Sequence, residues 1–205
     1  MDRSRQTVWY LGISLHTVSY GERDIKVLEH KELSETIGPC HKDGLIVDDN
    51  VIICDSWGQI HVVDTISAKI KHTIHVANSP LSSPTLYGKQ KRCFLVGSYD
   101  GRLMSFHLEG SVIQAPTKEW EVDVGSTIFA RPLVLPNETS CVVCTTTGDV
   151  VIIDINSQSK LAQSQIRGEI WSDPKVVGVD EKGIFSLVAF GARDSCGHIL
   201  TVKLN

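Results

Sequence analysis

Short apolar runs, each ended by a turn rich in glycine and aspartate, recur along the chain. The first runs are residues 51–54, 93–96 and 141–144, and the runs after the turns are residues 59–64, 102–106 and 150–154. Two β-rich runs joined by such a turn are typical of a β-hairpin. Helical periodicity is not sustained over the roughly 11–18 residues that an amphipathic helix needs. The pattern therefore predicts an all-β chain built from hairpins.

The hairpins repeat, and two landmarks mark each unit. A glycine lies in the turn, and a proline precedes the next unit's first run. The glycines are Gly58, Gly101 and Gly148, spaced 43 and 47 apart, and the prolines are Pro84, Pro132 and Pro174, spaced 48 and 42 apart. A fourth, degenerate unit begins at Pro174, and Gly44 stands near the proline position of the earliest unit. A period of about 40–50 residues with four short strands is typical of a β-propeller blade.

We therefore expect about four four-stranded antiparallel blades within residues 36–205, and a degenerate or partial N-terminal blade within residues 1–35. Four blades lie at the low end for closed propellers, so the ring either closes at four or stays partial and open. An open ring leaves blade edges exposed, which favours self-association through those edges.

The repeat also suggests where side chains pack. Leu81, Phe129 and Trp171 stand three residues before the prolines and are expected to fill the wedge between adjacent blades. Four residues before each turn glycine the residue is small: Cys54, Gly97 or Cys144. Small residues are needed where inner strands lie close together.

Composition narrows the function classes. The 205 residues are 41% hydrophobic and 21% charged, with a net charge of −4. These values indicate an ordinary globular protein and argue against nucleic acid or a membrane as the main partner. The polar N-terminal start is a poor signal peptide, and six cysteines without a secretion signal favour reduced thiols and a cytoplasmic location.

Candidate catalytic and metal-binding chemistry is sparse in the sequence. Cys141 and Cys144 have the spacing of half a zinc ribbon. However, they lie in an expected strand, where residues three positions apart face opposite sides of the sheet. No second cysteine pair in the sequence completes a four-ligand zinc site. The histidines are scattered, and no nucleophile and base stand together. We therefore expect no catalytic residues and no metal site.

The repeat resembles that of pyrroloquinoline quinone (PQQ)-type propellers. Gly97-Ser98-Tyr99-Asp100-Gly101 matches the family's turn, and residues 64–69 and 154–160 are similar to its last segment. A dehydrogenase that uses PQQ needs a calcium ion held by carboxylates, an aspartate that acts as the base, and a tryptophan that packs against the quinone. The candidates are Asp100, Asp149, Asp194, Trp57 and Trp171. We expect Asp100 and Asp194 to serve instead as turn residues that bond their own backbone, and no cofactor to be bound.

A closer resemblance covers about residues 60–205. The segments 80–84, 97–101, 128–132, 168–174 and 191–194 are similar to the C-terminal propeller of the beta-alanine-activating enzymes, an acyl-CoA synthetase-like family also called aminoadipate-semialdehyde dehydrogenase. In that family an ATP-dependent adenylation domain and a phosphopantetheine carrier domain precede the propeller. The motifs of those domains do not occur in this sequence.

The resemblance implies a non-catalytic β-propeller interaction module without the adenylation and carrier domains. Its partner would be a protein or a carrier-tethered substrate. The candidate binding-face residues are Trp57, Arg131 and Arg193. The alternative is a fragment of a PQQ-dependent oxidoreductase, which would bind PQQ and calcium.

Overall fold

The computed structural model describes residues 6–9, 14–20, 25–32, 37–40, 42–110, 114–180 and 185–203, with backbone alone for residues 6–32 and for Phe185. Residues 1–5, which begin the expected partial blade, and the expected boundary between residues 35 and 36 lie outside the described residues. Every described element is a β-strand, a turn or an irregular segment. Among these residues no helix is long and apolar enough to cross a membrane.

The strands form five antiparallel sheets, in chain order. The first sheet is β1 (Gln6–Trp9), β2 (Ser14–Tyr20) and β3 (Ile25–Glu32). The second is β4 (Leu45–Val47), β5 (Asn50–Cys54), β6 (Gln59–Asp64) and β7 (Ile70–His75). The third is β8 (Thr85–Tyr87), β9 (Cys93–Gly97), β10 (Arg102–His107) and β11 (Thr117–Asp123). The fourth is β12 (Leu133–Val134), β13 (Ser140–Cys144), β14 (Asp149–Asp154) and β15 (Ser159–Gln165), and the fifth is β16 (Lys175–Val179), β17 (Phe185–Gly191) and β18 (Gly197–Lys203).

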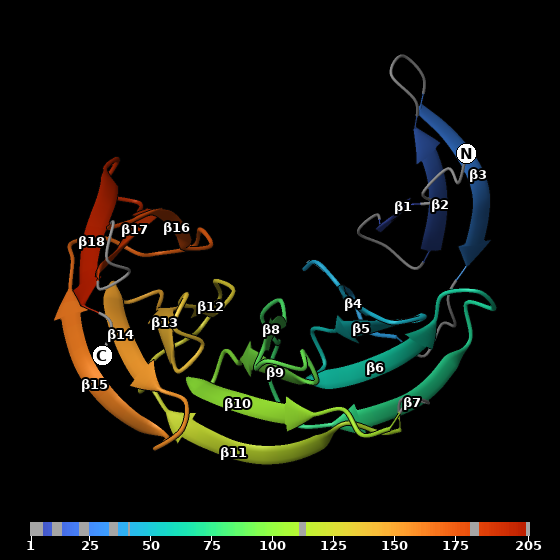
Figure 1. Ribbon diagram of the computed structural model, residues 1–205, viewed down its shortest axis with the longest axis horizontal. Helices are drawn as coiled ribbons and strands as arrows, with labels where there is room; N and C mark the ends of the chain where they lie inside the picture. The colour runs from blue at the N-terminus through green and yellow to red at the C-terminus, as the bar shows by residue number, and fades with distance from the viewer. Residues whose placement is uncertain are drawn as a thin grey trace.

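The sheets stand side by side in an open arc (Figure 1). The short strands β4, β8 and β12 lie on the inside of the arc, and the long strands β7, β11 and β15 lie on the outside. The first and last sheets flank the opening. The predicted all-β propeller is confirmed in its open form, with three four-stranded blades and a three-stranded sheet at each end of the described chain.

A β-bulge at a repeated position identifies equivalent strands. The two outer strands of a sheet shift register at Val62/Val63 in the second sheet, Ser105/Phe106 in the third and Ile152/Ile153 in the fourth. The same shift occurs at Thr17/Val18 between β2 and β3. Consequently β3 corresponds to the outermost strand of a blade. In the described residues the first sheet therefore has no innermost strand, whereas the last has no outermost strand.

The core lies in the wedges between neighbouring sheets. Phe94 and Phe106 of the third sheet stack with their ring centroids 5.3 Å apart and pack against apolar side chains of the second sheet, including Ile52 and Ile60. The opposite side of the third sheet packs against the fourth through Leu95 and its neighbours. Each blade buries both faces only between its neighbours, which is why the repeats fold as an array.

The residues that fill the wedges differ from the prediction at two of three positions. Leu81 is buried, as expected, but the large apolar residues that are fully buried in the next two linkers are Ile128 and Ile170. The N–H groups of Leu81 and Ile128 donate to equivalent turn carbonyls, at Asp55 and Ser98. One extra residue between this position and the proline moves Phe129 and Trp171 out of the wedge, so counting back three residues from the proline selects the wrong residue.

The small residues before the turns do lie against these wedge residues. Cys54 and Cys144 are buried, and a Cβ atom on Gly97 would lie 2.3 Å from Cγ2 of Ile128. The space needed by Ile128 therefore explains the glycine at position 97. Each repeat proline comes directly before an innermost strand, where it costs no ladder hydrogen bond; these prolines are Pro84, Pro132 and Pro174.

Candidate functional site

One end of the blades carries two kinds of connection, and we call it the top face. It comprises the turns at 55–58, 98–101, 145–148 and 192–196, and the linkers at 76–84, 124–132 and 166–174, which lead into the innermost strands. The linkers lie against the turns through backbone hydrogen bonds, for example from Tyr99 N–H to the Pro80 carbonyl at 3.0 Å. The top face is therefore built from residues of every described blade from the second to the fifth.

Four equivalent residues meet at the inside of this face. Each lies two residues before an innermost strand, and the four are Asp43, Ser83, Arg131 and Asp173. The N–H of Asp43 donates to Ser83 Oγ at 3.1 Å, and the N–H of Arg131 donates to Asp173 Oδ1 at 2.7 Å. The Arg131 guanidinium donates to Asp43 Oδ2 at 2.6 Å and lies 3.8 Å from Asp173 Oδ2. Arg131 therefore links carboxylates of the second and fifth sheets.

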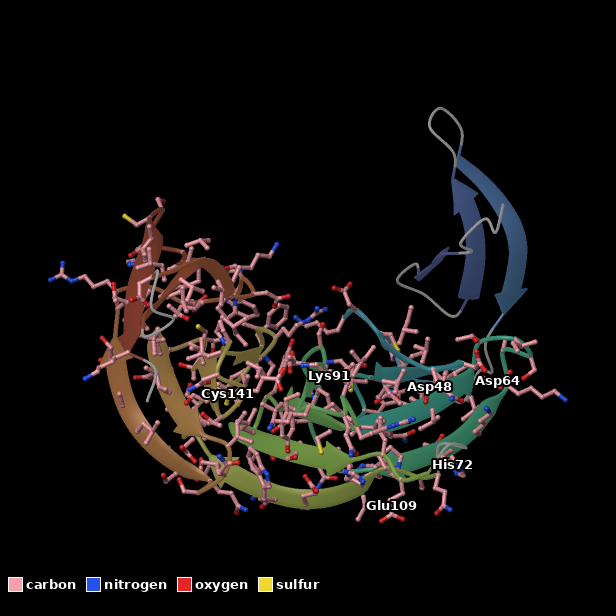
Figure 2. The ribbon with its side chains drawn as sticks, viewed as in Figure 1. Asp48, Asp64, His72, Lys91, Glu109 and Cys141 are labelled. Atoms are coloured by element: carbon pink, nitrogen blue, oxygen red, sulfur yellow. The ribbon has the colours of Figure 1, made fainter. Side chains whose placement is uncertain are left out.

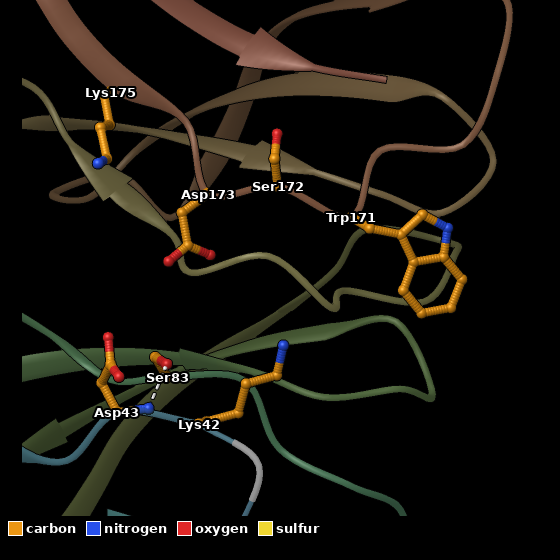
Figure 3. Close-up of a pocket in the computed structure, with 7 residues that line it drawn as sticks. All are labelled: Lys42, Asp43, Ser83, Trp171, Ser172, Asp173 and Lys175. Atoms are coloured by element: carbon orange, nitrogen blue, oxygen red, sulfur yellow. Dashed lines mark hydrogen bonds between the residues drawn. The ribbon is translucent and has the colours of Figure 1, made fainter. Parts of the chain in front are cut away.

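Three of these residues, Asp43, Ser83 and Asp173, line a pocket of about 450 Å³. Its lining is drawn in Figure 3 and consists of Lys42, Asp43, Ser83, Trp171, Ser172, Asp173 and Lys175. The side chains of Asp43 and Asp173 approach from opposite walls, and the Trp171 indole stands at one side (Figure 3). The lining carries two lysines and two aspartates, and the neighbouring Arg131 adds a further positive charge beside them.

Lys42 makes a close contact with an aromatic ring on this face. Its Nζ lies 2.9 Å from the ring centroid of Phe129, a cation–π contact. The pKa of Lys42 is lowered to about 8, chiefly because the ammonium group is buried; Asp173 and Asp43 oppose this shift and Arg131 adds to it. A negatively charged ligand in the pocket would offset this desolvation and favour the charged ammonium.

A row of side chains in mutual contact crosses the top face beside the pocket. The rings of Tyr99 and Phe129 are 5.7 Å apart, and Phe129 meets Trp171 edge-on at 4.6 Å. The Arg193 guanidinium lies 4.8 Å from the centre of the Trp171 ring. Glu169 accepts hydrogen bonds from Trp171 Nε1 at 2.8 Å and from Arg193 Nη1 at 3.1 Å, which fixes both. We call Tyr99, Phe129, Trp171 and Arg193 the aromatic row.

The three candidate binding residues from the sequence all lie on the top face, but they are not all together. Arg131 pairs with two aspartates that line the pocket, and Arg193 ends the aromatic row. Trp57 is 52% exposed and lies in the turn of the second sheet, packed against Gly38, where a Cβ would be 2.7 Å from an indole carbon. The sequence analysis missed Phe129 and Trp171 as face residues, because their position depends on the extra linker residue, and it did not single out Lys42, which lies before β4.

The carboxylates considered for a calcium and PQQ site are each engaged within their own blade. Asp149 accepts bonds from Thr147 Oγ1 at 2.7 Å and Gln163 Nε2 at 3.0 Å, which lower the pKa of its carboxyl group. Asp194 accepts a bond from the N–H of Cys196, a bond to its own loop that again lowers the pKa. Asp100 accepts a bond from the Ser98 hydroxyl, a side-chain partner where a backbone partner was expected.

The buried thiols offer no nucleophile. Burial raises the pKa of Cys40, Cys141 and Cys144 to about 12, and that of Cys54 still further. Cys141 lies on β13, among the strands of the fourth sheet (Figure 2), and all six cysteines are free thiols. Cys141 and Cys144 are packed in different wedges, as expected for positions three apart in a strand.

A buried polar pair, Asp55 and His61, was not singled out from the sequence. The Asp55 carboxylate accepts bonds from the N–H groups of Gly38, Trp57 and Gln59, at 2.8–3.0 Å, and from His61 Nε2 at 3.0 Å. Both side chains of the pair are fully buried. The pair fixes the Trp57 turn and the preceding linker, so its role is to position part of the top face.

The comparisons with known proteins concern the fold. No protein-family model and no curated protein matches the chain. Among solved structures, the β-propeller domain of Cps50 (Swd1) from Myceliophteria thermophila is similar with a TM-score of 0.71 and 12% identity, over 94% of this chain and 64% of that one. BamB from Moraxella catarrhalis is similar with a TM-score of 0.64 and 18% identity, over 93% of this chain and 52% of that one. The chain thus has a propeller fold and spans between half and two thirds of the length of these two structures.

Proposed function

We propose that this chain is a non-catalytic propeller module that binds a protein partner through its top face. The observation that carries the proposal is the aromatic row beside the pocket. Aromatic and arginine side chains are the residue types most enriched in the energetic centres of protein interfaces. Glu169 holds Trp171 and Arg193 in place, so less side-chain entropy is lost on binding.

The pocket and the row favour an acidic segment as the bound part of the partner. Arg193 is largely exposed, with 68% of its side chain accessible, and Lys175 is exposed at the pocket wall. A carboxylate near Lys42 would compensate for the burial that lowers the pKa of that ammonium group. Opposite charges at an interface mainly increase specificity and the association rate.

A peptide selection tests this function. Random 12-residue peptides displayed on phage would be selected against the purified chain, and the affinity of the enriched peptides measured by fluorescence polarisation. We expect acidic peptides, whose affinity falls by about tenfold or more on Arg193→Glu, a change of about 1.4 kcal/mol. Lys69→Glu reverses a charge in the β6–β7 turn at the opposite end of the blades and is the matched control. Equal losses for both variants, or enrichment of peptides without acidic residues, would contradict the proposal.

The more specific proposal is that the module is related to the C-terminal propeller of the beta-alanine-activating enzymes and binds a carrier-tethered substrate. The repeat motifs support it, whereas the comparisons add nothing to it. The isolated carrier domain of such an enzyme, with and without its phosphopantetheine arm, is the appropriate probe. Binding that needs the arm would support a tethered substrate as the ligand. We further propose a cytoplasmic location, which the free thiols support, and no bound cofactor.

Self-association is the remaining part of the proposal, and the fifth sheet supports it. Leu187 is 40% exposed and Ile199 is 69% exposed. They alternate with Val188, Phe190 and Val202, which pack against the fourth sheet. β18 is also an edge strand within the described sheet. An apolar sheet face with an unpaired edge favours association.

We expect light scattering on a gel-filtration column to give a mass near twice 22.6 kDa. The double variant Leu187→Glu/Ile199→Glu should reduce the mass to that of one chain, because it places charges on the apolar face. Ile66→Glu, at a residue that is 70% exposed in the β6–β7 turn, should leave the mass unchanged. A wild-type monomer would contradict self-association and leave the peptide-binding proposal intact.

A further inference from the structure

Three side chains with metal-binding atoms meet in the third sheet, away from the top-face pocket. They are Cys93, His107 and Glu119, and their ligand atoms all lie within 4.8 Å of one another. The sequence analysis did not group them, because they are 14 and 12 residues apart and come from three different strands.

The strand register explains how they meet. Cys93 of β9 and His107 of β10 are directly paired, so their side chains lie on the same face of the sheet. Glu119 lies at the register shift between β10 and β11, where Ser105 pairs with Trp120 and Phe106 with Lys118. It is therefore the extra residue of the bulge. A bulge redirects a side chain relative to the regular alternation, and here it directs Glu119 toward the other two.

The spacing of the atoms fits a small tetrahedral metal ion. Cys93 Sγ is 3.3 Å from His107 Nδ1, and Glu119 Oε1 is 4.0 Å from the same nitrogen. Ligands bound to one Zn²⁺ at the usual bond lengths are roughly 3.4–3.6 Å from each other. The sulfur–nitrogen separation lies within about 0.2 Å of this range, the nitrogen–oxygen separation is about 0.5 Å longer, and all three ligand atoms lie within 4.8 Å of one another, so small side-chain adjustments would bring them onto one ion. The His107 and Glu119 side chains are 37% and 38% exposed, which leaves a path for an ion.

Two hydroxyl groups orient the carboxylate of Glu119. Its Oε2 accepts hydrogen bonds from Ser105 Oγ at 3.1 Å and from Tyr87 Oη at 3.3 Å, and the two hydroxyls are themselves 2.6 Å apart. The other oxygen, Oε1, is the one that faces His107. Outer hydrogen bonds of this kind hold metal-binding carboxylates in position.

The same geometry does not suit a cysteine nucleophile with a histidine base. In such a triad the third residue orients the ring through the nitrogen that does not face the nucleophile. Here Cys93 and Glu119 both approach Nδ1. Burial also raises the pKa of the Cys93 thiol, with Glu119 adding to the shift. The side chains of Cys93, His107 and Glu119 instead direct their ligand atoms toward one point, which is the arrangement expected of a metal site.

Equivalent positions in the neighbouring sheets hold no such set. In the second sheet the three residues are Asn50, Asp64 and Lys71, and the Lys71 ammonium occupies the centre, 2.8 Å from Asn50 Oδ1 and 2.7 Å from Asp64 Oδ2. In the fourth sheet they are Ser140, Asp154 and Leu161. The second sheet thus places a cation between oxygen ligands at this position, and the third sheet offers sulfur, nitrogen and oxygen ligands without a lysine.

We propose that Cys93, His107 and Glu119 bind one Zn²⁺ ion. Thiolate, imidazole and carboxylate are the ligand types that Zn²⁺ takes, and three protein ligands leave the fourth position for water. The thiol proton is released to solvent when the metal binds. The site is independent of the proposed binding function of the top face.

Calorimetric titration of the full chain with ZnCl₂, and absorption spectroscopy with Co²⁺ as a substitute, test the site. We expect one metal ion per chain and a thiolate-to-cobalt charge-transfer band. Cys93→Ser and Glu119→Lys, which copies the second sheet, should weaken zinc binding by about 100-fold or more. Loss of an outer hydroxyl, in Ser105→Ala, should cost roughly 10–100-fold.

Cys196→Ser and His75→Ala remove an exposed thiol and an exposed imidazole elsewhere and are the matched controls, since both should leave zinc binding unchanged. Circular dichroism without metal checks that each variant is folded, and Glu119→Gln provides a milder change if Cys93→Ser is not. Binding that survives the Cys93 and Glu119 variants, or that is lost in the Cys196 control, would overturn the proposal. So would the absence of a one-to-one isotherm in the wild-type chain.

Discussion

Asp55→Ser should destabilise the chain by about 3–5 kcal/mol, the range found when one partner of a buried polar pair is removed. The carboxylate accepts four hydrogen bonds at 2.8–3.0 Å and is inaccessible to solvent. A serine at this position can still bond the N–H of Gln59, as Ser98 bonds that of Arg102 in the next sheet. The N–H groups of Gly38 and Trp57, and His61 Nε2, would lose their acceptor. Urea denaturation monitored by tryptophan fluorescence measures the change.

The double variant Asp55→Ser/His61→Met provides the control, because Ser98 and Met104 occupy the equivalent positions of the third sheet. Replacing both partners of a buried polar pair can be nearly neutral. The double variant should therefore be more stable than the sum of the two single variants predicts. Strict additivity, within about 0.5 kcal/mol, would show that the two residues act independently.

Gly58→Ala should cost roughly 2–5 kcal/mol, which combines about 1–2 kcal/mol for a left-handed backbone with about 1–3 kcal/mol for overpacking. Gly58 has a φ of 77°, and a Cβ atom would lie 1.9 Å from the Ala77 carbonyl oxygen. That oxygen belongs to the linker backbone, which donates hydrogen bonds to the Gly58 carbonyl from Val76 and Ala77. The linker therefore has to move to accommodate the methyl group.

Gly88→Ala separates the two causes. Gly88 has a φ of 80°, but nothing lies within 4 Å of the added Cβ. This variant should lose only the conformational part of the stability, about 1–2 kcal/mol. The corresponding contacts are 2.6 Å at Gly148 and 2.9 Å at Gly101, so the loss of stability should decrease in the order Gly58, Gly148, Gly101, Gly88. Equal urea midpoints for Gly58→Ala and Gly88→Ala would refute a role for the close contact.

The local features of each blade could be predicted from the sequence. Turn glycines, strand-starting prolines and alternating apolar runs act over a few residues, so their spacing predicted the hairpins and the propeller. Gly44 illustrates this, since it directly precedes β4, where the other repeats have proline. The number of strands in the terminal sheets could not be predicted as well, because the repeat pattern of apolar runs, turn glycines and prolines is incomplete there.

Features that depend on linker geometry were predicted less well. Phe129 and Trp171 were assigned to the wedges by counting from the proline, yet Ile128 and Ile170 occupy them. A single extra residue in an irregular segment shifts every position before it, and no hydrophobic periodicity exists there to reveal the shift. The resulting displacement of two aromatic rings creates the aromatic row.

By itself, the sequence determined the class of the fold, because the turn residues and the two-residue alternation of each hairpin are local properties. Tertiary structure alone decided which distant residues meet. Arg131 joins Asp43 across 88 residues of chain, and Cys93, His107 and Glu119 converge only through strand register and a bulge. Such contacts depend on how neighbouring strands and blades are aligned. That alignment is set by packing across the whole array and is not encoded in any short segment.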